Sequence, residues 1–149
     1  MFIRNYDPSP RSATDITFGM IVRNGGRSLK ACLESVSALC EEIIVVDTGS
    51  SDHSRDIAQS FGAKVIDAKW TNDFAAARNI YVERAQCGWI LSLDADEVLG
   101  RLPKIELAKV LNRCPRTAFT FEIRNYFLED SVPPFVLPSR QTGDAPAGM

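Results

Sequence analysis

The stretch GWILSLDADEVL, residues 88–99, joins an apolar segment to a cluster of acids. Apolar residues dominate as far as Leu93, and three acids then follow within four positions, at Asp94, Asp96 and Glu97. Carboxylates gathered at the end of a buried segment repel one another and lose hydration unless a cation or hydrogen-bond donors lie beside them. The stretch therefore predicts a buried strand that ends at a binding site.

On either side of this stretch, strand-length apolar runs alternate with segments of helical periodicity. ITFGMIV at residues 16–22 is a continuous apolar run, which predicts a strand buried on both faces. Further strands are expected at residues 42–47, 63–68 and 89–94. Helices are expected at residues 28–39, from Phe74 to Gln86 and between Pro103 and Arg113, and a fourth begins at a cap, Ser50 or Ser51, and ends at Gly62. Asp73 is the expected cap of the helix that begins at Phe74. The last helix is suggested by the helical spacing of Ile105, Ala108 and Leu111. The alternation indicates βαβ units, and hence an α/β fold with a mostly parallel sheet flanked by helices.

The two ends of the chain differ from this central part. Residues 1–14 are polar and contain proline, so we expect a flexible leader. TAFTFEIRNYF at residues 117–127 alternates between apolar and polar residues, which predicts an antiparallel strand at the sheet edge. Residues 131–149 are rich in Pro, Gly, Ser and Ala, and we expect them to be a disordered tail. The expected domain therefore covers residues 15–130.

Composition and missing motifs exclude several classes of protein. The formal net charge is −2 and no Lys/Arg block is present, so we expect no nucleic-acid partner. No apolar run approaches the roughly 20 residues that span a bilayer, and the first residues lack the apolar stretch of a secretory signal, so we expect a cytoplasmic protein without a transmembrane segment. A single histidine, with no G-x-S-x-G, P-loop or G-x-G-x-x-G motif, disfavours triad hydrolases, P-loop proteins and dinucleotide-binding domains. The four cysteines form no C-x-x-C pair and are interpreted as reduced, mostly buried residues.

Polar side chains follow three of the expected strands at the point where each strand ends. Asn24 follows the first strand, Asp47 ends the second, and the Asp94-x-Asp96 pair follows the fourth. The carboxyl ends of parallel strands share one edge of a sheet, and ligands of open α/β sheets bind at that edge. A single acid at such a position is usually a helix cap or a turn residue. Acids at two strand ends together predict a binding site.

The D-x-D spacing is compatible with a divalent cation, because alternate residues that leave a strand diverge. One carboxylate then faces a metal while the other holds a ligand hydroxyl. Mg²⁺ or Mn²⁺ takes only one or two protein carboxylates and fills its shell with phosphate oxygens and water. Such a cation neutralises a diphosphate that gains charge as it leaves. Acidic strand ends also occur in phosphatases and nucleases, so the pair alone leaves those classes open.

The segment DFAAARN, residues 73–79, adds a positive charge near the acids. Arg78 lies one helical turn beyond Phe74, and an arginine beside an acidic crevice binds phosphate in a bidentate manner. A structural ion pair between Arg78 and a neighbouring aspartate is an equally open alternative. Trp70 is expected in the core or in a lid over the site.

Taken together, these segments resemble the family 2 glycosyltransferases. The resemblance is carried by ITFGMIVRNGGRSLKACLESV, EEIIVVDTGSSDHSRDIAQSFGAKV, WTNDFAAARN and GWILSLDADEVL, which follow in the order and spacing of a bacterial subgroup of that family. The similarity runs from Ile16 to Phe127. It implies a GT-A fold, which is a Rossmann-like sheet, and a nucleotide-diphosphate-sugar donor of the UDP or GDP type. It also implies inverting transfer of the sugar to an acceptor, assisted by Mg²⁺ or Mn²⁺.

The resemblance also implies roles for individual residues. Asp96, the expected catalytic residue, would ligate the metal that bridges the diphosphate, and Asp94 would face the ribose or the metal. Asp47 would meet the base, and Arg78 would meet the nucleotide or its phosphates. The remaining expected substrate-binding residues come from the end of the first strand: Ile21 and Val22 would line the nucleotide pocket, and Asn24 follows them.

The chain departs from the family pattern at two places. Gly25 stands where the subgroup usually has an acidic residue, which is expected to loosen contacts with the donor. The later half of the family, which supplies the acceptor site and the carboxylate base, has no counterpart after FEIRNYF. Glu129 and Asp130 are the acids available as a base for inverting transfer. The sequence is therefore interpreted as the N-terminal, nucleotide-binding part of a truncated glycosyltransferase.

Two other functions stay open at this point. A non-catalytic remnant that serves as a binding or interaction module would explain the missing acceptor half. A metal-dependent phosphatase would need a nucleophilic aspartate after the first strand, where Arg23 and Asn24 stand. A parallel sheet needs cover on both faces, so we also expect self-association if the missing half leaves the sheet incompletely covered.

Overall fold

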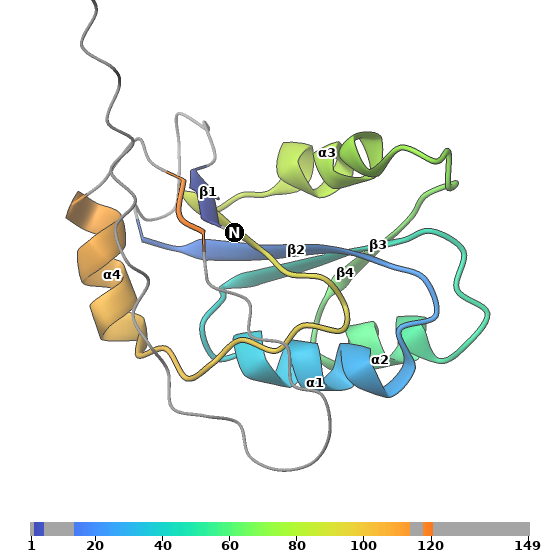
Figure 1. The fold of residues 1–149 in the computed structure, drawn as a ribbon, viewed down its shortest axis with the longest axis horizontal. Helices are drawn as coiled ribbons and strands as arrows, with labels where there is room; N and C mark the ends of the chain where they lie inside the picture. The colour runs from blue at the N-terminus through green and yellow to red at the C-terminus, as the bar shows by residue number, and fades with distance from the viewer. Residues whose placement is uncertain (1, 5–13, 114–117, 121–149) are drawn as a thin grey trace, which may run out of the picture.

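A computed structural model of the 149-residue chain describes residues 2–4, 14–113 and 118–120. These residues form one layered α/β unit (Figure 1). The elements in chain order are β1 (Phe2–Arg4), β2 (Ile16–Val22), α1 (Gly26–Val36), β3 (Glu42–Asp47), α2 (Ser54–Ser60), β4 (Lys64–Asp67), α3 (Phe74–Arg84), β5 (Trp89–Ser92) and α4 (Lys104–Arg113). No helix within the described ranges is long and apolar enough to cross a membrane.

The strands form a single sheet in the order β1-β5-β2-β3-β4. Strands β2, β3, β4 and β5 are parallel, and only β1 is antiparallel, paired with β5. In the register, Val22 lies opposite Asp47, and Asp47 lies opposite Asp67. The mostly parallel sheet predicted from the βαβ alternation is therefore confirmed, and the ends of β2, β3 and β4 lie at one level of it.

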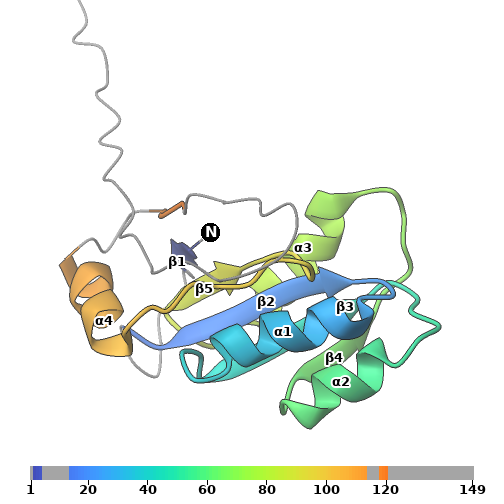
Figure 2. The same ribbon diagram turned by 60° about the horizontal axis from the view of Figure 1, so that its bottom comes forward.

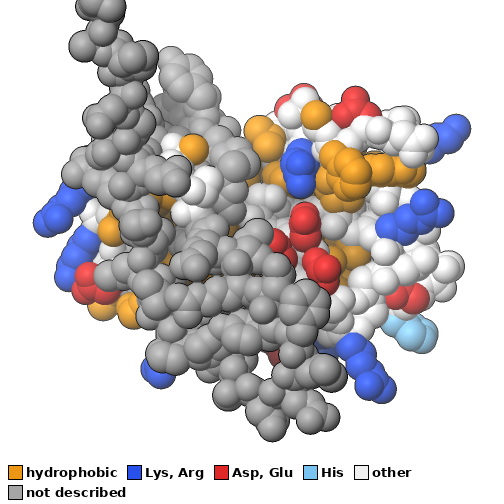
Figure 3. All heavy atoms as spheres, viewed as in Figure 1, with side chains coloured by type: hydrophobic (Ala, Val, Ile, Leu, Met, Phe, Trp, Pro, Cys, Tyr) orange, Lys and Arg blue, Asp and Glu red, His pale blue; other side chains and the backbone are white. Residues whose placement is uncertain are grey.

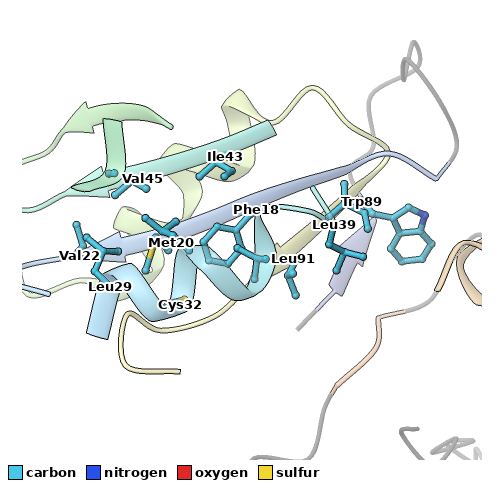
Figure 4. Close-up of a cluster of buried hydrophobic side chains, with 14 of the residues drawn as sticks. Phe18, Met20, Val22, Leu29, Cys32, Leu39, Ile43, Val45, Trp89 and Leu91 are labelled. Atoms are coloured by element: carbon cyan, nitrogen blue, oxygen red, sulfur yellow. The ribbon is translucent and has the colours of Figure 1, made fainter. Parts of the chain in front are cut away.

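One face of the sheet packs against α1 and α2, which lie side by side on it (Figure 2). Alternate residues of β2 and β3, among them Phe18, Met20 and Val45, point into this layer and meet Leu29 and Cys32 of α1 (Figure 4). The continuous apolar run of β2 has its physical reason here, because a central parallel strand needs apolar side chains on both faces.

The opposite face packs against α3 and has a smaller core, in which Tyr81 is the aromatic residue. Gly19 of β2 makes room for that ring, since a Cβ added at Gly19 would lie 2.2 Å from Tyr81 Cδ2. The Tyr81 hydroxyl is 2.8 Å from Ser92 Oγ, so α3 is also fixed to β5. This close packing fixes the helix that carries Arg78.

Several local predictions agree with the structure. The Asp73 side chain caps α3 by accepting a hydrogen bond from Ala76 N at 2.9 Å. Gly62 follows α2 with φ +73°, and the hydrogen bonds Gly62 N to Gln59 O and Ala63 N to Ala58 O complete a Schellman motif.

Other local predictions are wrong. Phe2–Arg4, expected in the flexible leader, pairs with β5 as an edge strand, because the far side of β5 offers free backbone groups. Neither Ser50 nor Ser51 caps α2, which begins at Ser54, because both serines bind Asn24 instead. Strand β5 ends at Ser92, two residues before Asp94.

Helix α4 forms where the spacing predicted it, and of the three residues that suggested it only Leu111 is buried. Leu107 and Leu111 are the buried residues of α4, whereas Ile105 is 71% exposed, because the helix presents its i, i+4 pair to the core that contains Trp89. Of the strand expected at residues 117–127, the structure describes residues 118–120, where Phe119 forms an isolated bridge; the rest lies outside the described residues.

Candidate functional site

Three loops meet at the carboxyl edge of the sheet. They follow β2 at residues 23–25, β3 at residues 48–53 and β5 at residues 93–97. Since β2 lies between β5 and β3, the first loop is flanked by the other two. A Cβ added at Gly25 would lie 3.6 Å from Ala95 Cβ, so the first and third loops are in contact. The structure thus brings the predicted residues Asn24, Asp47, Asp94 and Asp96 to one edge.

Asn24 ties the first loop to the second. Its backbone has φ 54°, a left-handed conformation in which asparagine is favoured over most side chains. Its N–H donates to Ser50 Oγ at 2.9 Å, and its Oδ1 accepts from Ser51 N at 2.8 Å. Asn24 is predicted to bind substrate, and in this structure its side chain is already used to hold a loop.

Asp52 and Ser54 make a second link between the same loops, and the sequence analysis missed both. Asp52 Oδ2 accepts from Gly26 N at 3.0 Å, and Asp52 Oδ1 accepts from Ser54 N and Ser54 Oγ at 3.0 and 2.5 Å. Ser54 Oγ in turn accepts from Gly25 N at 2.8 Å. The hydrogen bonds from the Ser54 hydroxyl and from backbone N–H groups hold the pKa of Asp52 below its usual value. The signal in the sequence was an aspartate two residues before the first residue of α2, a spacing typical of an Asx turn, in which the carboxylate accepts from the backbone N–H two residues on.

Asp47 has the turn role that a single strand-end aspartate usually has. Its side chain is 3% exposed, and its Oδ1 accepts from Gly49 N at 3.1 Å and from Ser50 N at 2.8 Å. Its Oδ2 lies 3.7 Å from Arg55 Nη2, and Arg55 also pairs with Asp67 of β4. The contact of Asp47 with a nucleobase stays a prediction, because both of its carboxylate oxygens already have partners in the structure.

The two apolar residues predicted to line a nucleotide pocket have different surroundings. Val22 is 2% exposed and belongs to the core with Leu29, and its carbonyl accepts from Thr48 N and Thr48 Oγ1. Ile21 is half-buried on the α3 face of the sheet. Of the pair, only Ile21 has side-chain surface that a ligand reaches.

The residues that follow β5 form a closed turn, here called the acid turn and defined as residues 94–97. Glu97 N donates to Asp94 O at 3.0 Å, and Glu97 Oε2 accepts from Asp94 N at 2.8 Å. The side chains of Asp94 and Asp96 are exposed. Within the described residues, the Asp96 carboxylate has no hydrogen bond and no ion pair. The turn is therefore fixed by its own backbone and by Glu97, while both aspartates face solvent.

Arg78 lies beside the acid turn, where it forms an ion pair with a neighbouring aspartate, one of the two alternatives that the sequence left open. Its Nη2 is 3.8 Å from Asp94 Oδ1, with the two side chains 46% and 72% exposed. An exposed pair at this distance contributes about 0–1 kcal/mol, so Arg78 exchanges the carboxylate for another anion at little cost. The guanidinium also lies over the ring of Phe74, with Cζ 5.9 Å from the ring centroid.

Aromatic side chains extend this surface on the other side of Arg78. Phe74 is 60% exposed and meets Trp70 edge to face, with the ring centroids 4.7 Å apart. Trp70 is half-buried and borders a groove of about 300 Å³ between α3 and residues 66–73. Figure 3 shows acidic side chains gathered on this face, close to a basic side chain and to hydrophobic groups. The site therefore combines exposed carboxylates, a guanidinium and aromatic surface.

The acid turn has the donor set of a site for Mg²⁺ or Mn²⁺. No three Asp, Glu, His or Cys side chains converge on one point within the described part of the chain. Two exposed aspartates on one turn fit cations of this kind, which take one or two protein carboxylates and complete their shell with phosphate and water. Burial, together with the nearby charges of Glu97, Asp96 and Asp94, raises the pKa of the Cys32 thiol to about 12. The acids considered as a base, Glu129 and Asp130, lie outside the described residues.

Known proteins of similar sequence include the following two relatives. A TPR repeat-containing protein of Synechococcus elongatus is 43% identical over 105 residues, which cover 70% of this chain and 26% of the relative. The SPbeta prophage-derived glycosyltransferase SunS of Bacillus subtilis is 40% identical over 97 residues, which cover 64% of this chain and 23% of SunS. The chain thus spans about a quarter of the length of these relatives.

Solved structures and a family model agree with these relatives. The crystal structure of S. aureus TarS aligns with a TM-score of 0.59 at 17% identity, over 66% of this chain and 20% of TarS. This likeness concerns the fold, which is the N-terminal part of a GT-A sheet flanked by helices. The family model described as Glycosyl transferase family 2 matches residues 17–134, and the chain therefore belongs to glycosyltransferase family 2.

Proposed function

We propose that the chain binds a nucleotide-diphosphate sugar of the UDP or GDP type together with Mg²⁺ or Mn²⁺, as the donor site for inverting transfer of the sugar to an acceptor. The observation that carries the proposal is the acid turn at the carboxyl edge of a family 2 sheet, in which Asp94 and Asp96 are exposed and Asp94 lies beside Arg78. Membership of the family supports transfer as the class of reaction. The acceptor is not assigned.

The residues have distinct tasks in this proposal. Asp96 and Asp94 would hold the cation, which would supply positive charge to neutralise the diphosphate. Arg78 turns from Asp94 to a phosphate oxygen, where a charge-assisted and bidentate contact replaces a long and exposed ion pair. The aromatic surface at Phe74 and the half-buried Ile21 give apolar contact area close to the same edge.

The transfer step itself needs one more group. The acceptor oxygen attacks the anomeric carbon as the bond to the diphosphate breaks on the opposite side, and a base takes the proton of the acceptor. Since the chain spans about a quarter of its relatives, we assign donor binding to the described residues and leave the base unassigned.

The test is calorimetry of UDP and of GDP, with and without MnCl₂, on the wild type, Asp96→Ala and Glu106→Ala. Glu106 is the matched control, an exposed carboxylate on α4 that pairs only with Lys109 among the described residues. We expect metal-dependent binding of one nucleotide by the wild type and by Glu106→Ala, and its loss in Asp96→Ala. Equal binding by the wild type and Asp96→Ala would refute the site.

The same samples separate donor binding from transfer. Release of free sugar from UDP- or GDP-sugars over hours measures hydrolysis by the chain. Nucleotide binding without sugar release supports a binding module, the alternative function from the sequence. Sugar release that disappears in Asp96→Ala supports a catalytic domain.

A further inference from the structure

Helix α1 contacts the acid turn and Leu99, two residues beyond it, through two side chains that the proposed function does not use. Cys32 is fully buried, and its Sγ donates to Asp94 O at 3.6 Å. Ser35, one turn further along the same helix, accepts from Leu99 N at 3.0 Å through its Oγ and donates to Cys32 O at 2.6 Å. The two contacts bracket the segment from Asp94 to Leu99.

Glu97 completes the set from within the turn. Its sequence position suggested a third acid in the cluster, but its Oε2 accepts from Asp94 N at 2.8 Å. Its own N–H donates to Asp94 O, the same carbonyl that Cys32 contacts. Glu97 is half-buried, whereas Asp94 and Asp96 are exposed.

We propose that Cys32, Ser35 and Glu97 are positioning residues, which hold the acid turn so that the Asp94 and Asp96 carboxylates are in place before a divalent cation binds; this inference rests on the proposed function. The three side chains bind backbone groups of residues 94 and 99, between which Asp96 lies. A turn ordered in advance does not have to lose conformational entropy when the cation and the diphosphate arrive.

The first experiment separates positioning from direct coordination by Glu97. Mn²⁺ binding is titrated by electron paramagnetic resonance in the presence of UDP or GDP, for the wild type, Glu97→Ala and Glu97→Gln. We expect Glu97→Ala to weaken Mn²⁺ binding roughly tenfold, the effect of one lost hydrogen bond to a charged group. Glu97→Gln should stay within about threefold of the wild type, because the amide oxygen still accepts from Asp94 N. If both variants lose affinity equally, the charge of Glu97 is what matters and the positioning role is overturned.

Ser35→Ala tests the contact from the helix, with Ser37→Ala as the matched control. Among the described residues, Ser37 Oγ donates only to Glu34 O within its own helical turn, and Ser37 is exposed. Ser35→Ala should weaken Mn²⁺ binding severalfold, and Ser37→Ala should leave it unchanged. Equal effects of the two variants would overturn the role of Ser35.

A second measurement does not depend on any ligand. Amide hydrogen exchange, followed by NMR in the free protein, should become faster at Asp94 in Glu97→Ala and faster at Leu99 in Ser35→Ala, while amides of β2 stay protected and show that the variants are folded. Unchanged exchange at both amides overturns the inference whatever the metal does. If exchange responds but the wild type binds no cation, the proposed function fails and the contacts serve the fold alone.

Discussion

The carboxylate that begins β3 and the two aspartates of the acid turn have opposite surroundings. At the amino end, Glu42 begins β3 with a side chain that is 9% exposed and surrounded by donors. It accepts from Thr17 Oγ1 at 2.7 Å, from Gln86 N at 2.9 Å and from Lys64 Nζ at 2.6 Å. These donors come from β2, from the residues that follow α3, and from β4, so the Glu42 carboxylate links β3 to all three of these segments.

Its neighbour Glu41 does the same on a smaller scale. Glu41 Oε2 accepts from Ile16 N at 2.8 Å, and its other oxygen pairs with Lys104 of α4. The pair raises the pKa of the Lys104 ammonium above its usual value, because the charged form is the one that the carboxylate binds.

The acid turn at the carboxyl end lacks this supply of donors, unlike Asp47 and Asp52 in the neighbouring loop, which accept several hydrogen bonds. Asp94 has one exposed contact, 3.8 Å from Arg78, and Asp96 has no hydrogen bond or ion pair with the described residues. The comparison shows that the number of nearby donors, and not the acid itself, separates a carboxylate that stabilises the fold from one that is free to bind a ligand. The four predictions below test this difference, from the largest expected effect to the smallest.

The largest effect is expected at the amino end. Glu42→Ala should lower the free energy of unfolding by about 3 kcal/mol, because it leaves Lys64, Thr17 and the Gln86 N–H without their acceptor. Urea denaturation measures this change. The control is Glu83→Ala, an exposed acid of α3, which should stay within about 0.5 kcal/mol of the wild type. If the two variants are equally stable, the Glu42 carboxylate does not stabilise the fold.

At the carboxyl end the same kind of change should affect binding and not folding. Asp96→Ala should weaken metal-dependent nucleotide binding by at least about thirtyfold, which corresponds to about 2 kcal/mol. Its free energy of unfolding should stay within about 0.5 kcal/mol of the wild type, since the exposed carboxylate fastens nothing in the described structure. Calorimetry and urea denaturation on the same samples check both parts. A loss of stability as large as that of Glu42→Ala would show that the Asp96 carboxylate, like that of Glu42, stabilises the fold.

Asp73 is an intermediate case, an exposed acid at the carboxyl end that has a structural task. Asp73→Ala should lower the free energy of unfolding by about 1 kcal/mol, because it removes the cap on Ala76 N at the start of α3. Asp73→Ser keeps a capping oxygen and should recover most of that stability. Thermal or urea denaturation of the three proteins decides this, and a loss that serine does not recover would show that the charge of Asp73 matters more than its cap.

The smallest effect is a pH dependence at the amino end. Burial raises the pKa of Glu42, but the hydrogen bonds from Lys64, Gln86 N and Thr17 outweigh it and hold the pKa below the ordinary value of 4.5. A carboxyl group whose pKa is lower in the folded state stabilises the fold above its unfolded pKa, and this contribution is lost as the pH falls through the folded value. The stability difference between the wild type and Glu42→Gln should therefore shrink between about pH 6 and about pH 3. A constant difference over this range would contradict the assignment.

Much of the candidate site was predictable because its signals are local. Asp73 as a helix cap, Gly62 after α2 and the strand ends before Asn24 and Asp47 all depend on neighbouring residues. The roles of the site residues stay predictions. Val22 and Glu97 show the limit of this kind of analysis, since the first is buried in the core and the second binds the backbone of its own turn.

The sequence by itself determined the alternation of strands and helices, the parallel sheet and the edge at which the polar residues gather, because periodicity and turn chemistry act over a few residues. Only the tertiary structure decided which acids have hydrogen-bond donors around them and which are exposed to solvent. The donors of Glu42 lie 22 to 44 positions away in the chain, and the serine that holds Leu99 lies 64 positions away. Contacts over such distances arise from the packing of whole elements, and no local pattern in the sequence contains them.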